Sequence, residues 1–205
     1  EANAELARTK ADQLGIPRAY GDFQELINDP DITCVHICTP NFLHYPQSKA
    51  ALLAGKHVVC EKPLATKTEE AEELVKIARE KGLVNALHFN VRYYPLVRQM
   101  KTMREKGDLG EIFSIMGSYL QDWLFLNTDY NWRLEPDKSG ESRAIADIGS
   151  HLMDLIEYVT GLHVTEVLAD FSTVHKTRMK PLKAIETYSG KMLTPEDYQE
   201  VPINT

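Results

Sequence analysis

Short apolar runs alternate with amphipathic stretches along the first 90 residues of the chain. The run Thr-Cys-Val-His-Ile-Cys at residues 33–38 has the length and composition of a central parallel strand, and two further strands are predicted at residues 57–60 and 83–89. Helical periodicity lies between them, in segments that begin at a capping Asp22 or Thr68 or end at a glycine: residues 1–15, 22–27, 43–54 and 68–81. This alternation predicts an α/β fold with a doubly wound parallel sheet.

The pattern changes after Asn90. A long aromatic and polar stretch, residues 119–142, interrupts the periodicity, and the elements expected around it are helices at residues 97–105 and 148–159 and strands at residues 112–119 and 164–174. We therefore expect two domains, residues 1–90 and residues 91–205. The second is an α+β domain.

Charge and composition restrict the partners of this protein. The 205 residues carry a formal charge of -7 and contain no stretch dense in lysine and arginine, which argues against nucleic acid and anionic membranes. No apolar run approaches the roughly 20 residues that a transmembrane helix needs. Small molecules are therefore the expected partners.

Three cysteines, Cys34, Cys38 and Cys60, lie in apolar runs. An odd number in such positions does not indicate a disulfide framework and favours a reducing, cytoplasmic location. Cys34, His36 and Cys38 alternate along one predicted strand instead of converging at the loop spacing of zinc ligands, so we expect no metal site.

Ligands of open α/β sheets bind beyond the carboxyl ends of the parallel strands. Thr39-Pro40-Asn41 and Glu61-Lys62-Pro63 directly follow the first two predicted strands. Lys62 at such an edge can direct a positive charge and three donors at a ligand, and Pro63 stiffens its turn. A solvated lysine that precedes a helix is the alternative, because loop lysines are common.

Asp147 and His151 are four residues apart at the start of the helix predicted at residues 148–159. This spacing places both on one helical face, where a carboxylate can orient an imidazole that exchanges a proton near neutral pH. The alternative makes Asp147 an N-cap and His151 an ordinary half-exposed residue. Gly149 favours the first interpretation, since a helix-weakening glycine suggests close approach by another group.

Trp132 and Arg133 lie in the aromatic stretch. Arg133 could bind a carboxamide or a phosphate while Trp132 forms a wall of the pocket, although aromatic stretches often simply pack between elements.

Taken in order, these motifs resemble the Gfo/Idh/MocA oxidoreductases: Thr39-Pro40-Asn41 with His44, Glu61-Lys62-Pro63-Leu64-Ala65, and Asp147-x-x-x-His151 with Gly149 between. The resemblance covers nearly the whole chain. It implies that residues 1–90 are an incomplete Rossmann domain that binds NAD or NADP. Residues 91–205 would be an incomplete substrate and oligomerisation domain with a mainly antiparallel sheet. It further implies hydride transfer between the nicotinamide and a carbon of a sugar or polyol.

The resemblance also implies roles for individual residues. Lys62 would be the catalytic lysine, His151 the general acid/base, and Asp147 the residue that orients His151 and binds substrate. Those implied to contact the cofactor are Thr39, Pro40, Asn41, His44, Glu61, Lys62, Asn90, Trp132 and Arg133. Asn90 with Arg92 would close the crevice.

One feature of the family is missing from the chain. No Gly-x-Gly-x-x-Gly spacing, which would bind the pyrophosphate at a helix N-terminus, occurs in the sequence. We therefore expect these residues, ending at Ile203-Asn204-Thr205, to be an internal part of a chain roughly 330 to 390 residues long that forms a homodimer or homotetramer. The family also leaves two alternatives open, a glycoside hydrolase that oxidises a sugar transiently with bound NAD, and a regulatory protein that senses NAD(P) without turnover.

Overall fold

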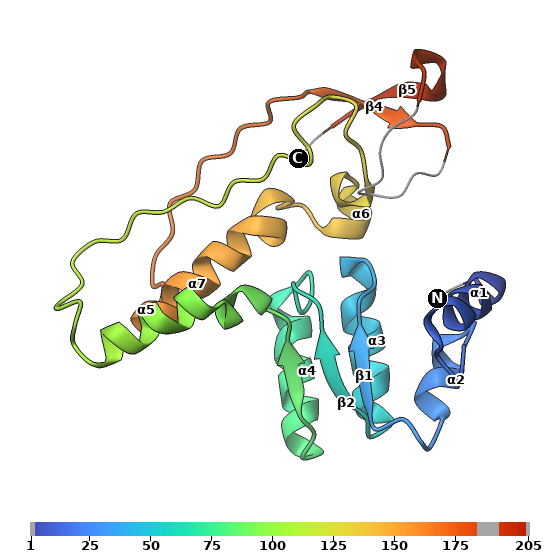
Figure 1. Ribbon diagram of the computed structural model, residues 1–205, viewed down its shortest axis with the longest axis horizontal. Coiled ribbons are helices and arrows are strands. Elements are labelled where there is room, and N and C mark those ends of the chain that lie inside the picture. The colour runs from blue at the N-terminus through green and yellow to red at the C-terminus, as the bar shows by residue number, and fades with distance from the viewer. Residues whose placement is uncertain (1–2, 184–192, 204–205) are drawn as a thin grey trace. The chain divides into compact units, whose positions relative to one another are not determined.

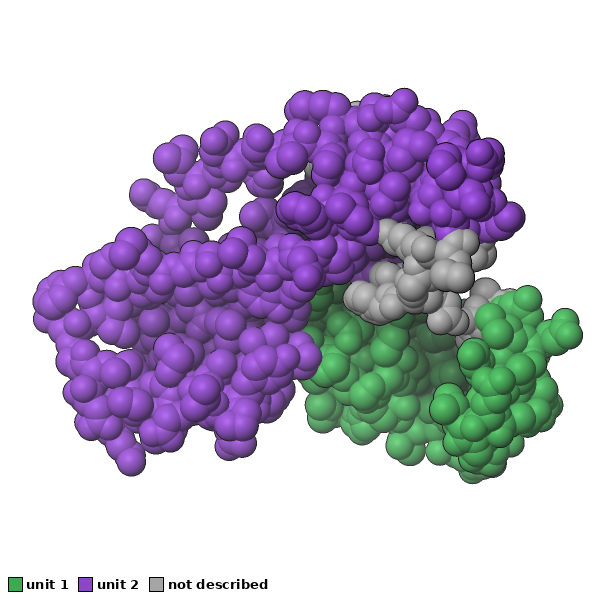
Figure 2. Space-filling view, turned by 45° about the horizontal axis from the view of Figure 1, so that its top comes forward, with its two compact units in different colours: residues 1–88 green, residues 89–205 purple. Residues whose placement is uncertain are grey.

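The computed structural model describes residues 3–183 and 193–203. The chain divides into two compact units, unit 1 at residues 1–88 and unit 2 at residues 89–205 (Figure 2). This division falls two residues before the boundary predicted at Asn90. Glu1 and Ala2, at the start of the first predicted helix, and Asn204 and Thr205 lie outside the described residues.

Unit 1 is built on a parallel sheet (Figure 1). Its strands, in spatial order, are β1 (Cys34–Ile37), β2 (His57–Cys60) and β3 (Asn85–Leu87). Helix α3 (Asn41–Leu53) connects β1 to β2, and α4 (Thr68–Glu80) connects β2 to β3. This strand-helix alternation was predicted from the periodicity, and it confirms the α/β class.

The core of unit 1 forms because one face of the sheet is apolar at every second position. Val35 pairs with Val58 and Ile37 with Cys60, and all four side chains are buried. The helical residues that pack against them are Ala51, Leu52, Leu74 and Ala78. Cys34 and His36 on the other face of β1 are exposed.

Two short helices precede the sheet. Helix α1 (Ala4–Leu14) begins where the Asn3 side chain accepts a hydrogen bond from the Leu6 amide at 2.9 Å, and it ends at Gly15, whose φ of 67° is left-handed. Helix α2 (Phe23–Asn28) has the predicted cap: the Asp22 side chain accepts from the Gln24 amide at 2.8 Å.

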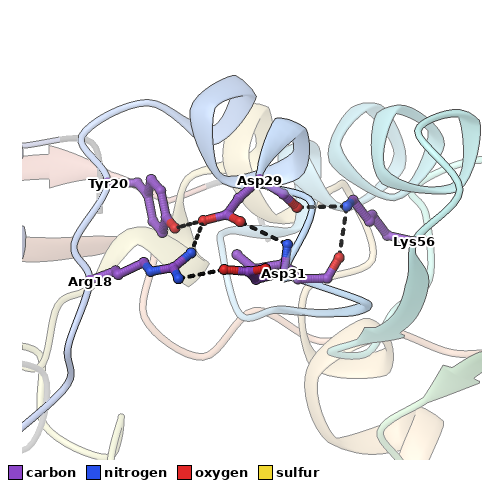
Figure 3. A network of polar contacts seen from close by, with 6 residues as sticks. Arg18, Tyr20, Asp29, Asp31 and Lys56 are labelled. Carbon is purple, nitrogen blue, oxygen red and sulfur yellow. Dashed lines mark hydrogen bonds and ion pairs between the residues drawn. The ribbon is translucent and has the colours of Figure 1, made fainter.

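A polar network fixes the turn that leads into β1 (Figure 3). Arg18 donates to the carboxylates of Asp29 and Asp31, at 2.5 Å each, and the Tyr20 hydroxyl also donates to Asp29. The Tyr20 hydroxyl, the Asp31 amide and Arg18 together lower the pKa of Asp29 to about 2. From the other side, buried Lys56 donates to two backbone carbonyls of the same turn, at 2.7 and 2.8 Å.

Unit 2 contains helices and one antiparallel pair of strands. Strands β4 (Thr177–Pro181) and β5 (Tyr198–Pro202) pair along their full lengths. The helical elements are η1 (Asn90–Tyr93), α5 (Pro95–Glu105), η2 (Trp132–Leu134), α6 (Pro136–Ser139), η3 (Ile145–Gly149), α7 (Ser150–Thr160) and η4 (Pro195–Asp197). Helices α5 and α7 pack together, and Arg104 of α5 donates to the Val159 carbonyl near the end of α7 at 2.9 Å.

Several local predictions were wrong. Residues 112–119 and 164–174 form no strand, because within the described residues they have no neighbour to complete a ladder, and many of their apolar side chains are exposed. Strand β1 lies at an edge of the described sheet instead of its centre, and β3 is shorter than the run at residues 83–89. Thr68 is the first residue of α4 and Lys67 occupies the cap position. Strands β4 and β5 were not predicted.

None of the helices in the part of the chain that the structure describes combines the length and apolar character that a membrane-spanning segment requires.

Candidate functional site

The two loops predicted to hold the cofactor lie at one edge of the unit 1 sheet. Ile37 and Cys60 are register partners at the ends of β1 and β2, and the Glu61 amide donates to the Ile37 carbonyl at 2.9 Å. The segment that begins at Glu61 therefore starts beside the segment that leads to Thr39. The parallel register thus brings together two motifs that are about 20 residues apart in the sequence.

The side chain of His44 contacts both of these loops. It lies in the first turn of α3 with 1% of its surface exposed. Its Nδ1 atom is 2.6 Å from the carbonyl oxygen of Pro63, and its Nε2 atom is 2.7 Å from the carbonyl oxygen of Thr39. Carbonyl oxygens only accept, so the ring donates to either loop, and with a proton on both nitrogens it donates to both. The predicted contact between His44 and a cofactor stays a prediction.

The remaining residues of the first loop are held by α3. The Thr39 hydroxyl donates to Gln47 Oε1 at 2.8 Å, one turn beyond His44. Pro40 occupies the N-cap position of α3, and Asn41, the first helical residue, is buried. A proline before the first turn favours this start because its φ is already close to the helical value.

Glu61 pairs with a histidine that was not predicted. The His88 Nδ1 atom lies 2.6 Å from Glu61 Oε1, and both side chains are partly exposed. His88 follows β3 and its amide donates to the Cys60 carbonyl at 2.8 Å, so it lies at the same edge of the sheet as Lys62. The strand predicted at residues 83–89 included His88, so the rule that ligands bind beyond strand ends pointed to Asn90; β3 ends at Leu87 instead, which places His88 directly after it.

Lys62 is partly exposed at this edge, and the peptide bond between Lys62 and Pro63 is cis. The neighbouring Cys38 thiol has a raised pKa, first because of burial and second because of the Glu61 charge. This edge of the sheet thus carries the ammonium of Lys62, the carboxylate of Glu61, the imidazole of His88 and the hydroxyl of Thr39. These groups match the hydroxyls of a ribose and the carboxamide of a nicotinamide in their hydrogen-bonding capacity.

In unit 2, Trp132 and Arg133 come together with Asp147. Arg133 Nε lies 3.5 Å from Asp147 Oδ1. The Arg133 guanidinium lies 4.5 Å from the ring centre of Trp132 and 5.5 Å from that of Trp123. Arg133 thus interacts with both an aromatic ring and a carboxylate, and the three predicted residues Trp132, Arg133 and Asp147 form one cluster.

His151 is buried among aromatic side chains of unit 2. Its ring is stacked on Tyr119, with centres 5.7 Å apart, and meets the Phe89 ring edge to face at 5.6 Å. This packing fixes the plane of the imidazole. Sequence analysis did not identify either aromatic partner, and the expected half-exposed alternative for His151 is wrong, since only 9% of its surface is exposed.

The segment between Asp147 and His151 is not a regular α-helix. Residues Ile145–Gly149 wind as a π-helix that continues into α7, so Asp147 lies within a helical turn and not at an N-cap. A π-turn has more residues than an α-turn, so a four-residue spacing falls just short of one turn instead of just past it, and Asp147 and His151 still occupy neighbouring positions on one face. The orientation of His151 by Asp147 stays a prediction.

Gly149 has a local explanation in this turn. A Cβ atom added at Gly149 would lie 3.0 Å from Ile145 Cδ1, closer than ordinary contacts. The glycine therefore relieves crowding with the preceding turn of its own helix, and the predicted approach of another group is not needed to explain it.

Asn90 and Arg92 belong to η1. Asn90 is exposed, whereas Arg92 Nε lies 2.9 and 2.7 Å from the two carboxylate oxygens of Asp154, a residue of α7 that was not predicted and whose side chain is 6% exposed. Arg92 also lies 5.1 Å from the ring centre of Tyr158. Within unit 2, Arg92 therefore joins η1 to the helix that carries His151.

A cavity of about 1040 Å³ opens beside Asp147. Trp123, Ile148 and Phe171 contribute apolar walls, and Arg143 contributes a guanidinium whose pKa is lowered by burial. Apolar walls with a few convergent polar groups are typical of small-molecule sites. Across the described residues there is no group of three or more histidine, cysteine, aspartate or glutamate side chains that could hold a metal ion.

Comparisons with known proteins connect this arrangement to one family. Residues 1–89 match the oxidoreductase family with an NAD-binding Rossmann fold, and residues 97–198 match the GFO/IDH/MocA C-terminal domain. A levoglucosan dehydrogenase from Pseudarthrobacter phenanthrenivorans is 41% identical over 162 residues, which are 78% of this chain and 41% of the relative. A 1,5-anhydro-D-fructose reductase from Ensifer adhaerens is 35% identical over 170 residues, which are 82% of this chain and 49% of the relative.

Solved structures agree with the sequence relatives. The levoglucosan dehydrogenase in complex with NADH and levoglucosan superposes with a TM-score of 0.75 at 40% identity, over 78% of this chain and 44% of that one. An oxidoreductase domain protein from Kribbella flavida gives a TM-score of 0.86 at 32% identity, over 99% of this chain and 52% of that one. The chain spans about half or less of the length of these relatives. With both family domains matched in order along the chain and the predicted motifs placed at the strand ends and on the π-turn, this protein belongs to the Gfo/Idh/MocA oxidoreductase family.

Proposed function

We propose that the full-length protein is an NAD(P)-dependent oxidoreductase that transfers a hydride between the nicotinamide and a hydroxyl-bearing carbon of a sugar or polyol. The observation that carries this proposal is the position of Glu61-Lys62-Pro63. It follows β2 at the carboxyl edge of a parallel sheet, beside the loop that contains Thr39. The relatives support it, since one was solved with NADH and levoglucosan.

Lys62 has the chemistry that this reaction needs. Oxidation of an alcohol develops negative charge on its oxygen as the hydroxyl proton is removed, before the carbonyl forms with departure of the hydride, and a positioned ammonium stabilises that charge. A preorganised donor of this kind typically contributes about 3 kcal/mol to transition-state stabilisation. Bound NAD(P) would supply only the hydride acceptor or donor. Thr39, Asn41 and Glu61, with their oxygen and amide groups at the same edge, are the residues proposed to hold its ribose and carboxamide.

His151 is the proposed general acid/base. An imidazole can take the hydroxyl proton during oxidation and return it during reduction. Stacking on Tyr119 supports this role, because an imidazole with a fixed plane presents its nitrogen in one direction. Asp147 is proposed to orient His151 and bind a substrate hydroxyl from the wall of the cavity.

We also propose a cytoplasmic location and a homodimeric or homotetrameric assembly for the full-length protein. The three cysteine thiols are free, and two of them are exposed, which suits a reducing compartment. The assembly follows from the family resemblance, and sedimentation of the full-length protein tests it.

The test is a titration of the full-length protein with NADH and NADPH, followed by turnover assays at 340 nm with levoglucosan, inositol and 1,5-anhydro-D-fructose. Lys62→Ala is compared with Lys76→Ala, a control at an exposed lysine of α4. Loss of kcat in Lys62→Ala alone supports the proposal. Near-normal turnover in Lys62→Ala contradicts the catalytic assignment. Glycosidic cleavage without net change in nicotinamide absorbance would instead indicate a hydrolase, and cofactor binding without any turnover a sensor.

A further inference from the structure

His44 is placed to control the loop that carries Lys62. Its ring lies between the loops that follow β1 and β2, with one nitrogen 2.7 Å from the Thr39 carbonyl and the other 2.6 Å from the Pro63 carbonyl. The Pro63 carbonyl belongs to the residue directly after Lys62. The contact with His44 therefore acts on the backbone from which the Lys62 side chain extends.

Helix α3, which carries His44, is held firmly against the sheet. His44 belongs to α3, whose Ala51 and Leu52 are almost completely buried against the sheet. The same helix holds the Thr39 hydroxyl through Gln47. Because α3 is packed along its length and His44 is itself 1% exposed, the ring cannot follow a movement of the loop, and it resists displacement of the Pro63 carbonyl.

We propose that His44 is a positioning residue that fixes the backbone at Pro63 and thereby aims Lys62 at the reacting oxygen. This inference rests on the proposed function and adds a residue to it. It differs from the expectation that His44 lines the cofactor, because both ring nitrogens face backbone carbonyls of the protein. The energetic reason for its effect on rate is geometric: displacement of a catalytic group by about 1 Å can cost about 100-fold in rate.

Two amide substitutions separate the two contacts. In His44→Asn the side-chain amide nitrogen occupies the place of Nδ1 and keeps the contact with Pro63. In His44→Gln it reaches the place of Nε2 and keeps the contact with Thr39. His44→Leu removes both. If the Pro63 contact positions Lys62, kcat of the full-length enzyme should fall about 10- to 100-fold in the Leu variant, as expected for a misplaced catalytic group. The Asn variant should retain more activity than the Gln variant, while the dissociation constant for NADH changes less than kcat.

A second measurement does not depend on turnover. Hydrogen–deuterium exchange of the peptide that follows Cys60 should be faster in His44→Gln than in the wild type and close to wild type in His44→Asn. If His44→Leu does not fold, the comparison of His44→Asn with His44→Gln still tests the inference. The inference is overturned if His44→Leu has the kcat of the wild type. It is also overturned if His44→Gln retains as much kcat as His44→Asn, or more.

The two proposals fail in different ways. A wild-type enzyme that oxidises or reduces no sugar or polyol contradicts the proposed function. Exchange at the loop after Cys60 then still decides whether His44 holds that loop: slower exchange in the Asn than in the Gln variant supports it, and identical exchange in all variants overturns it.

Discussion

The ion pair between Arg92 and Asp154 gives the sharpest test of how unit 2 is held together. Replacing Asp154 by Asn keeps the size of the side chain but removes its charge and turns an amide group toward the guanidinium. The two Arg92 Nε contacts, at 2.9 and 2.7 Å, then lose their carboxylate acceptor. Asp154 is 6% exposed and Arg92 40% exposed, so the pair is intermediate between a buried and a surface pair.

The magnitude follows from that intermediate exposure. Hydrogen bonds to charged groups contribute about 1.5–3 kcal/mol, and breaking a fully buried pair costs about 3–5 kcal/mol. Because water can still reach part of Arg92, we expect Asp154→Asn to lower the free energy of unfolding by about 2–3 kcal/mol. Since Asp154 lies one turn after His151 on α7, kcat should fall as well.

Urea unfolding measures this effect. The two tryptophans in these residues, Trp123 and Trp132, both lie in unit 2, so their fluorescence reports on its unfolding, with circular dichroism as the second probe. Glu105→Gln is the control, because Glu105 is 51% exposed and its contacts with Lys101 and Arg104 are long, at 4.0 and 3.9 Å, so they should contribute less than about 1 kcal/mol. A loss in Asp154→Asn no larger than in this control would refute the reasoning.

Three further predictions concern stability. Burial raises the pKa of the Cys60 thiol to about 11 from 9.0, so in that interval the thiol ionises mainly in the unfolded state. Between about pH 9 and pH 11 wild-type stability should therefore fall by about 2 kcal/mol relative to Cys60→Ala, and parallel pH profiles would contradict this. Gly149→Ala alone should change stability little, because helix preference offsets the contact with Ile145, whereas in an Ile145→Ala background it should stabilise by about 1 kcal/mol in thermal unfolding. Lys56→Met removes the two charge-assisted hydrogen bonds from buried Lys56 to the carbonyls of Asp29 and Ile32, and should lower the free energy of unfolding by about 2–4 kcal/mol. An unchanged urea midpoint would show that the network does not depend on Lys56.

The parts of the fold that could be predicted are those in which a local signal and the tertiary structure agree. The apolar run at β2, the Asp22 cap and the glycine after α1 each act within a few residues, so the sequence specifies them directly. Residues 112–119 have equally apolar side chains but form no strand, because a strand needs a partner that local sequence does not supply.

The candidate site divides in the same way. Lys62 was identified from its place after a strand, which is a property of the sequence pattern. The partner of Glu61, His88, lies 27 residues away and depends on the register of β2 with β3. The partner of Arg92, Asp154, depends on the packing of η1 with α7, which leaves no periodic signal.

The sequence by itself determined the α/β class, the order of strands and helices in unit 1, and the residue types at the strand ends, because hydrophobic periodicity and capping act over one or two turns of chain. Tertiary structure decided which of those residues meet. The link from His44 to Thr39 and Pro63 and the stacking of His151 on Tyr119 both depend on side chains that approach through space. Such contacts depend on how the elements pack and on their register, and neither can be read from the residues of one element alone.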